Sequence, residues 1–190
     1  FNTERFRKNI KLLNHRGPDH NDYWLSADEK HFMGFTRLSI MDLSASGNQP
    51  MFSSSKEFGI VFNGEIYNHL ELKKELIDLG HEFNSRSDTE VLLNSYIEWG
   101  ENCLQKLEGM FAFALIDKKS KKLILARDRA GEKPLYYFTK EGSIAYASEL
   151  KPLVESIEDS KEMNINAFNH YLGNGYIPRE ESIYLNINKT

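Results

Sequence analysis

Four short apolar runs between residues 110 and 148 constrain the fold of this chain more than any other feature. Polar turns separate the runs at residues 118–122, 130–133 and 140–142. Runs of this length, joined by turns, predict short antiparallel strands. Helical patterns stand before and after them, without the strand–helix–strand alternation of a parallel sheet. The sequence therefore favours an α+β fold, in which helices cover the faces of antiparallel sheets.

The stretch FNGEIYNHLELKKELIDLG (residues 62–80) changes from strand-like to helical spacing. Its first residue closes the apolar run Ile60–Phe62, which is typical of a strand buried on both faces. Asn-Gly is a common hairpin turn. A hairpin would need a second strand after it, but leucines recur there at helical spacing. We therefore expect Asn63-Gly64 to end the strand and to lead into a helix.

A further helix is expected to begin after Ser87. Glu90 stands three residues later, which is the spacing of a capping box, and apolar residues follow on one helical face. In a capping box the two side chains would each bond to the other residue's backbone N–H.

Composition excludes several classes of protein. The net charge is −4, from 24 basic and 28 acidic residues, and no basic run is long enough to suggest nucleic-acid binding. No apolar stretch approaches the length of a membrane span or of a secretion signal. The six histidines show no paired ligand spacing, so we expect no metal site. We expect a cytoplasmic protein that binds neither nucleic acid nor membrane.

Five residues could together bind a charged substrate. Arg37 interrupts an apolar run, where burial would require an anionic partner. The Asn63 amide and the Gly64 N–H could point together at a developing negative charge. Glu65 and Asp88 add two carboxylates. The set would complement a free amino acid that carries an amide.

Each of these groups also has a plainer explanation. Arg37 could form a structural ion pair, and Asn63-Gly64 could be a helix-entry loop. The two acids could simply favour the positive end of a helix dipole. Residue pattern alone leaves both interpretations open.

Eight motifs carry a resemblance to a known family. They are HRGPD (15–19), TRLSIMD (36–42), NQPM (48–51), FNGEIYN (62–68), SDTEVLL (87–93), LEGMFAFALID (107–117), ARDRAGEKPLYYF (126–138) and ASELK (147–151). They stand in the order seen in asparagine synthetases that use glutamine. The chain resembles the amino-terminal glutaminase domain of these enzymes, a class II glutamine amidotransferase of the N-terminal nucleophile hydrolase superfamily.

The resemblance implies a four-layer αββα sandwich of two antiparallel sheets. It places a glutaminase domain in residues 1–160 and an exit segment toward a synthetase domain in residues 161–190. It also implies the residues that bind glutamine: Arg37 for the α-carboxylate, Glu65 and Asp88 for the α-ammonium, Asn63 and Gly64 for the oxyanion hole, and backbone groups near Leu38 and Ile40 for the rest of the pocket.

One feature of the family pattern is absent from this chain. The family's nucleophile is a cysteine at the first position of the mature protein, whose own α-amino group is the general base. The chain begins at Phe1, and its one cysteine, Cys103, lies in the middle of a predicted helix. There a small buried apolar role is expected. We therefore expect a truncated domain, inactive by itself, from a longer protein with the cysteine upstream.

The resemblance implies that this longer protein hydrolyses glutamine through a thioester and channels the ammonia to a second domain. That domain would amidate aspartate with ATP and Mg²⁺, while the glutaminase domain needs no cofactor. Two alternatives remain: a degenerate, structural amidotransferase-like domain, and a glutaminase that serves a sugar or peptide acceptor. Family members are often dimers, so a homodimer is a further expectation.

Overall fold

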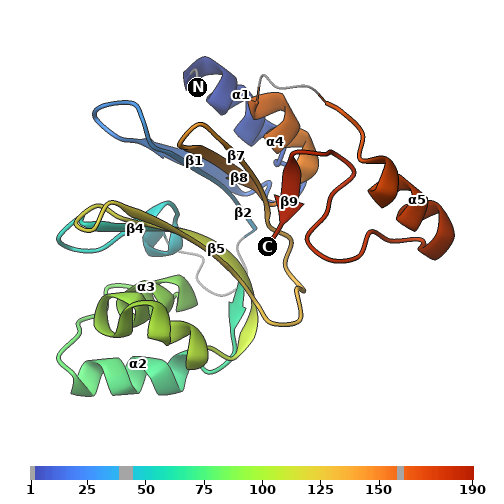
Figure 1. Cartoon of the computed structure of the whole chain (residues 1–190). Coiled ribbons are helices and arrows are strands. Elements are labelled where there is room, and N and C mark those ends of the chain that lie inside the picture. Colours follow the sequence, from blue (N-terminus) through green and yellow to red (C-terminus); the bar gives the residue numbers. More distant parts are fainter. Residues whose placement is uncertain (1–2, 39–44, 158–160) are drawn as a thin grey trace. The chain divides into compact units, whose positions relative to one another are not determined.

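The computed structural model describes residues 3–38, 45–157 and 161–190, which fall into two compact units (Figure 1). One unit is residues 14–133, and the other combines Phe1–Leu13 with Pro134–Thr190. The first unit contains, in chain order, β1 (His20–Leu25), β2 (Phe32–Arg37), a 3-10 turn (Ala45–Gly47), β3 (Met51–Phe52), β4 (Phe58–Ile66), α2 (His69–Asp78), α3 (Asp88–Trp99), the 3-10 helix η2 (Gly100–Gln105), β5 (Gly109–Asp117) and β6 (Lys122–Arg127).

The larger sheet of this unit is antiparallel, with the strand order β3-β4-β5-β6. β1 and β2 form a separate two-stranded sheet. Helices α2 and α3 cover one face of the larger sheet (Figure 1). Ile60, Phe62 and Ile66 of β4 belong to the core beneath these helices, together with Leu76 and Leu92. The helices that were expected after Gly64 and Ser87 are therefore confirmed.

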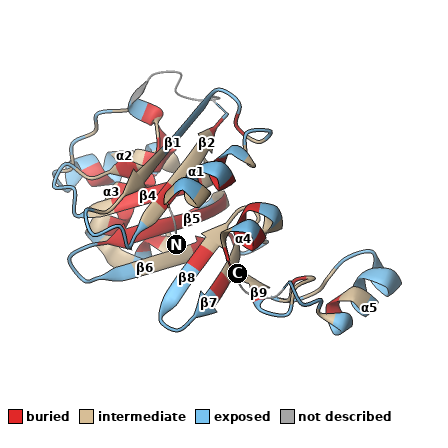
Figure 2. Cartoon of the chain, turned by 90° about the horizontal axis from the view of Figure 1, so that it is seen from above, coloured by how far each residue is buried: buried red, intermediate tan, exposed pale blue. Residues whose placement is uncertain are grey.

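The two central strands are deeply buried (Figure 2). β5 is buried at every residue from Phe111 to Asp117. In β4 the consecutive residues Ile60, Val61 and Phe62 are 0%, 9% and 4% exposed. Because successive side chains of a strand point to opposite faces, this run is buried on both faces, as its composition predicted.

The second unit contains α1 (Thr3–Lys11), β7 (Tyr136–Lys140), β8 (Ser143–Ala147), α4 (Leu150–Ser156), α5 (Ile165–Asn174) and β9 (Ile187–Lys189). Its antiparallel sheet has the order β8-β7-β9. Phe138, Ala145, Leu153 and Ile187 lie in its small core. β9 belongs to the segment that was expected to lead out of the domain, and the proposed boundary at residue 160 stays a prediction.

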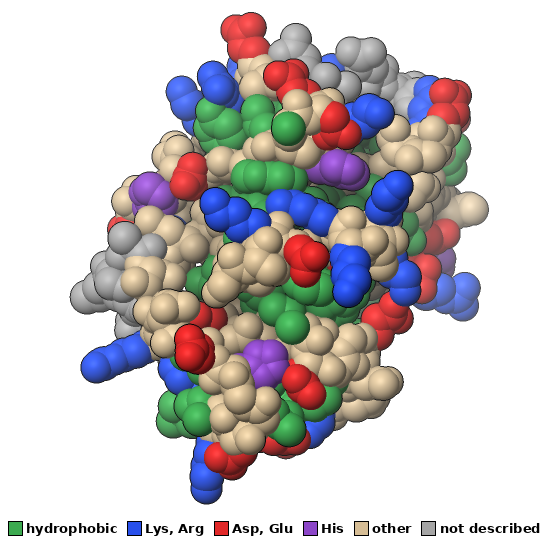
Figure 3. Space-filling model, turned by 90° about the vertical axis from the view of Figure 1, so that its left-hand side faces the viewer, with side chains coloured by type: hydrophobic (Ala, Val, Ile, Leu, Met, Phe, Trp, Pro, Cys, Tyr) green, Lys and Arg blue, Asp and Glu red, His purple; other side chains and the backbone are tan. Residues whose placement is uncertain are grey.

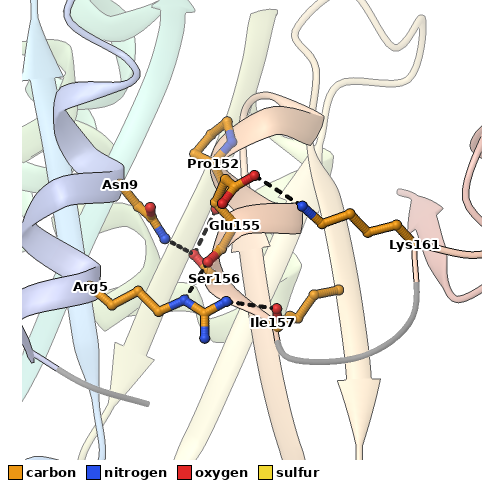
Figure 4. A network of polar contacts seen from close by, with 7 residues as sticks. All are labelled: Arg5, Asn9, Pro152, Glu155, Ser156, Ile157 and Lys161. Carbon is orange, nitrogen blue, oxygen red and sulfur yellow. Dashed lines mark hydrogen bonds and ion pairs between the residues drawn. The ribbon is translucent and has the colours of Figure 1, made fainter.

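Polar contacts tie α1 to the end of α4 (Figure 4). The Arg5 guanidinium donates to the carbonyl oxygens of Glu155 and Ile157, and the Asn9 amide donates to Ser156 Oγ at 2.9 Å. The last carbonyls of a helix have no intrahelical donor. Arg5 supplies donors at this end, so a residue near the start of the chain stabilises a helix far away in sequence.

The four strands expected between residues 110 and 148 are present, but they are divided between two sheets. β5 and β6 pair in one sheet, and β7 and β8 pair in the other. The loop after β6 is held by the Asp128 carboxylate, which accepts the N–H groups of Glu132 and Lys133. Hairpin spacing fixes neighbouring pairs, but it does not fix which pairs share a sheet. β3 and β9 were not expected, since two or three residues are too short to show a period.

Charged side chains of both signs lie intermixed on the face drawn in Figure 3, in keeping with the small net charge. No helix in the described part of the chain has the length and apolar character that a membrane crossing requires. Within residues 3–38, 45–157 and 161–190, no three His, Cys, Asp or Glu side chains are grouped to hold a metal ion.

Candidate functional site

Asn63 and Gly64 lie inside β4, and the strand does not end there. β4 continues to Ile66, and Asn63 and Gly64 pair with Ala112 and Phe111 of β5. The expectation that the strand ends at the Asn-Gly dipeptide is therefore wrong, although the hairpin is also absent.

The reason is a close approach of the two strands at Gly64. Its φ is +152°, a conformation that favours glycine, and a Cβ there would lie 2.1 Å from Met110 O and 2.7 Å from Phe111 Cα. Only glycine lets β4 and β5 continue to pair at this point. An Asn-Gly sequence can thus mark a tight strand contact instead of a turn.

The N–H of Gly64 points away from β5. Phe111 lies opposite Gly64, and both backbone polar groups of Phe111 bond to Asp128 on the far side of β5. Opposed residues in an antiparallel pair are either hydrogen-bonded or not, in alternation along the ladder. Gly64 and Phe111 are therefore a non-hydrogen-bonded pair.

The residues two positions before and after Gly64 face the same outer edge of β4. The N–H of Phe62 donates to Gln49 Oε1 at 2.6 Å, and the N–H of Ile66 donates to Asp88 Oδ2 at 3.0 Å. Alternation places the Gly64 N–H between these two contacts, at a strand edge that β3 does not reach.

The Asn63 side chain adds a second donor close to this edge. Alternation along β4 puts Asn63 and Glu65 on the face of the sheet opposite to α2 and α3. The Nδ2 atom of Asn63 is buried and makes no hydrogen bond to any described residue. Most buried polar groups in proteins are paired, so this unpaired amide donor is available to a ligand or to water.

Asp88 is the first residue of α3 and is 7% exposed. Burial raises the pKa of its carboxyl, and the nearby charge of Glu65 raises this pKa further, against the hydrogen bonds from Ile66 and Thr89 and the influence of His69. Burial is the main cause of the raised pKa of Asp88, and the charge of Glu65 adds to it. A cation placed between the two carboxylates would lower this pKa.

Ser87 caps α3, but Glu90 does not complete a capping box. Ser87 Oγ accepts the Thr89 N–H at 3.1 Å, as expected for an N-cap. The Glu90 carboxylate instead accepts the N–H groups of Asn84 and Ser85. Glu90 orders the loop before the helix, and Ser87 bonds to Thr89 instead of Glu90, so the N-cap is confirmed but the capping box is wrong.

Arg37 ends β2 and is 8% exposed. Its guanidinium donates from Nη1 to Asn48 Oδ1 at 2.6 Å. The backbone here packs against Gly17, where a Cβ would lie 2.4 Å from the carbonyl carbon of Thr36. The HRGPD motif (15–19), which contains Gly17, therefore positions the end of β2. Of the two other pocket residues that were expected, Leu38 is 56% exposed, and Ile40 lies outside the described residues.

Cys103 is a residue of η2, has no exposed surface and belongs to the hydrophobic core. Burial raises the pKa of its thiol to about 11. The thiolate is the reactive form of cysteine, so Cys103 is a structural residue, as expected from its position.

Sequence reasoning missed Asn48 and Gln49, because NQPM was named as a family motif but neither amide was given a role. Gln49 is 5% exposed and bonds to both backbone polar groups of Phe62 and to the Thr89 hydroxyl. Asn48 and Pro50 are residue types typical of turns, which gives no signal for the contacts of Gln49.

Comparisons with known proteins show the family to which this chain belongs. A family model described as glutamine amidotransferase domain matches residues 2–190. The chain is 39% identical over 186 residues to asparagine synthetase (glutamine-hydrolyzing) 1 of Bacillus subtilis, covering 98% of this chain and 29% of that protein. It is 47% identical over 146 residues to asparagine synthetase (glutamine-hydrolyzing) 3 of the same organism, covering 75% and 23%.

A third relative gives a similar result. The chain is 37% identical over 201 residues to a putative asparagine synthetase (glutamine-hydrolyzing) 2 of Methanocaldococcus jannaschii, covering 96% of this chain and 38% of that protein. The chain thus spans between 23% and 38% of the length of these relatives.

Solved structures show the same fold at lower sequence identity. Glutamine phosphoribosylpyrophosphate amidotransferase of B. subtilis superimposes with a TM-score of 0.63 at 22% identity, covering 76% of this chain and 38% of that one. A structure described as the allosteric regulatory enzyme of purine biosynthesis gives 0.65 at 22% identity, covering 80% and 40%. The predicted α+β class, with antiparallel sheets in the N-terminal nucleophile hydrolase fold, is confirmed. This chain belongs to the glutamine amidotransferase domain family and is homologous to the amidotransferase part of glutamine-hydrolyzing asparagine synthetases.

Proposed function

We propose that the protein of which this chain is a part hydrolyses glutamine at the outer edge of β4. The unpaired, buried Nδ2 of Asn63, beside the outward-facing N–H of Gly64, is the observation that carries this proposal. Two such donors match the oxygen of a tetrahedral intermediate, where negative charge develops during acyl transfer.

The remaining residues bind the two charged groups of the amino acid. The Arg37 guanidinium binds the α-carboxylate, and Glu65 and Asp88 bind the α-ammonium. This division agrees with the repulsion between Glu65 and Asp88, which a bound ammonium would relieve. Backbone groups near Leu38 and Ile40 line the rest of the pocket.

The nucleophile is a cysteine at the mature amino terminus, outside these residues. Its thiolate forms a bond to the side-chain amide carbon of glutamine, and the C–N bond breaks as the leaving nitrogen is protonated and departs as ammonia. Water then hydrolyses the thioester, which gives glutamate and returns the thiol. The burial and raised pKa of Cys103 support a nucleophile elsewhere.

The names and lengths of the relatives support a second domain that uses the ammonia. In this proposal that domain uses ATP and Mg²⁺ to amidate aspartate, and the glutaminase domain needs no cofactor of its own. The acceptor site lies outside these 190 residues. Amidation of a sugar or a peptide would leave every role assigned here unchanged.

Asn63→Ala in the full-length protein with its natural amino terminus tests the proposal. Loss of one oxyanion donor should lower kcat for glutamine hydrolysis about 10²- to 10³-fold. Glutamate release from glutamine measures this step, and synthesis with added ammonia should stay unchanged in the same preparation. Asn94→Ala, on the outer side of α3, is the matched control.

Two outcomes would contradict the proposal. If Asn63→Ala releases glutamate at the wild-type rate, the Asn63 side chain is not an oxyanion donor. A full-length protein that works only with added ammonia would make this a structural, amidotransferase-like domain. Residues 1–190 alone should release no glutamate, because the nucleophile is missing.

A further inference from the structure

The NQPM motif brings two adjacent amide side chains to the groups that the proposed function needs. Asn48 contacts Arg37, and Gln49 contacts β4 and α3. Asn48 and Gln49 are called the amide clamp below. Neither residue has a place in the proposed chemistry, although both are held in the interior or near it.

Gln49 takes the position of a missing strand residue. β3 pairs with β4 only at Ile60 and Gly59. Two residues further along the same edge of β4, the Gln49 side chain accepts the Phe62 N–H at 2.6 Å and donates to Phe62 O at 3.2 Å. A side-chain amide thus continues the ladder up to the residue before Asn63.

The same amide reaches α3. Gln49 Nε2 also donates to Thr89 Oγ1 at 3.2 Å. Thr89 is 2% exposed and directly follows Asp88. Gln49 therefore links the strand that carries the oxyanion donors to the helix turn that carries a carboxylate for the ammonium.

Asn48 holds Arg37 without neutralising it. Its Oδ1 accepts from Nη1 at 2.6 Å, and an amide oxygen carries no net charge. A carboxylate at this position would form an ion pair with the guanidinium and would compete with the α-carboxylate of a substrate.

We propose that the amide clamp consists of positioning residues that set the spacing between Arg37, Asn63 and Asp88 for glutamine hydrolysis. The inference rests on the proposed function. Gln49 fixes β4 before Asn63 and thus governs the chemical step, whereas its bond to Thr89 and the bond of Asn48 to Arg37 govern substrate binding. A displacement of about 1 Å in a site of this kind can cost about 100-fold in rate.

Three variants of the full-length protein separate these roles. Gln49→Met keeps the length of the side chain and removes its hydrogen bonds, so glutaminase kcat should fall about 100-fold. Thr89→Val removes only the link to α3 and should raise the glutamine KM about two- to tenfold, with kcat little changed. Asn48→Asp should also raise KM, because the added carboxylate competes with the α-carboxylate of glutamine for Arg37. Gln105→Met, at an exposed glutamine of η2, is the control and should change neither value.

Synthesis with added ammonia is measured in every preparation, because a merely structural role would lower it together with the glutaminase. Parallel loss of both activities in Gln49→Met and Thr89→Val would overturn the inference. Wild-type kcat and KM in all three variants would also overturn it. If Gln49→Met does not fold, the KM change in Thr89→Val and Asn48→Asp decides the matter alone. A wild-type protein without glutaminase activity would instead overturn the proposed function, and this inference with it.

Discussion

Two buried aspartates of the same unit show opposite behaviour. Asp128 follows β6 and is 7% exposed, as is Asp88 at the start of α3. Burial opposes the charge of each carboxyl. At Asp128 this effect is outweighed by N–H donors from Glu132, Lys133, Phe111 and Gly131, and its pKa is lowered. At Asp88 burial prevails and the pKa is raised.

The difference lies in how completely the protein satisfies each charge. Asp128 accepts backbone N–H groups from two segments and stabilises the connection between them. Asp88 has fewer donors, and the charge of Glu65 adds to the effect of burial on its pKa. A carboxylate satisfied by its own fold contributes to stability, whereas one left short of positive partners is suited to bind a cationic ligand.

Asp128→Asn should have the largest effect on stability. An asparagine keeps one oxygen acceptor and presents an N–H₂ group to donors that now bond a carboxylate. We expect a loss of about 2 to 3 kcal/mol at neutral pH, measured by urea unfolding of the full-length protein. Because the pKa of Asp128 is lowered on folding, its stabilisation is present above the ordinary value of 3.8 and is lost as the pH falls through the folded pKa. The difference in free energy of unfolding between the variant and the wild type should therefore shrink at acid pH. A difference that does not change with pH would contradict this account.

Asp88→Asn should mainly weaken substrate binding. The asparagine oxygen still accepts the Ile66 N–H, but the charge opposite the substrate ammonium is lost. The glutamine KM should rise roughly 10- to 100-fold, as expected for loss of a charge-assisted contact. Steady-state glutamate release measures it, with ammonia-dependent synthesis as the internal control.

The stability of the same variant should have the opposite pH dependence. The pKa of Asp88 is raised on folding, so the ionised carboxylate costs folding free energy as the pH rises through the folded pKa. Asp88→Asn removes this cost and should equal or exceed wild-type stability at neutral pH. A marked loss of stability there would place Asp88 with Asp128 as a structural carboxylate.

Glu65→Gln is the smallest change and sharpens the comparison. The charge of Glu65 raises the pKa of Asp88, so its removal should lower that pKa toward the ordinary value. The pH below which glutamine binding weakens should move down, and the KM at neutral pH should rise because one carboxylate is lost. A pH profile of KM tests both. If the low-pH part of the KM profile does not change, the charge of Glu65 does not act on Asp88.

Motifs and periodicity were sufficient for much of the fold. The α+β class, the buried run Ile60–Phe62 and the helices α2 and α3 follow from local spacing, which the chain expresses without tertiary context. Local spacing did not predict two kinds of feature, namely very short strands and long-range side-chain contacts. Strands β3 and β9 are too short to show a period, and the roles of Asn48 and Gln49 depend on partners 11 to 40 residues away.

The sequence by itself determined which candidate binding groups are present. They are the Arg37 cation, the two acids Glu65 and Asp88, and the Asn63-Gly64 pair, in an order shared with a family of amidotransferases. Only the tertiary structure decided the surroundings of these groups. Gly64 lies inside a strand instead of ending it. β5 approaches so closely there that only a residue without a Cβ allows the two strands to pair. Asn63 keeps an unpaired donor, and Asp88 is buried beside Glu65. Burial and long-range pairing set these properties, and neither is encoded in the local order of residues.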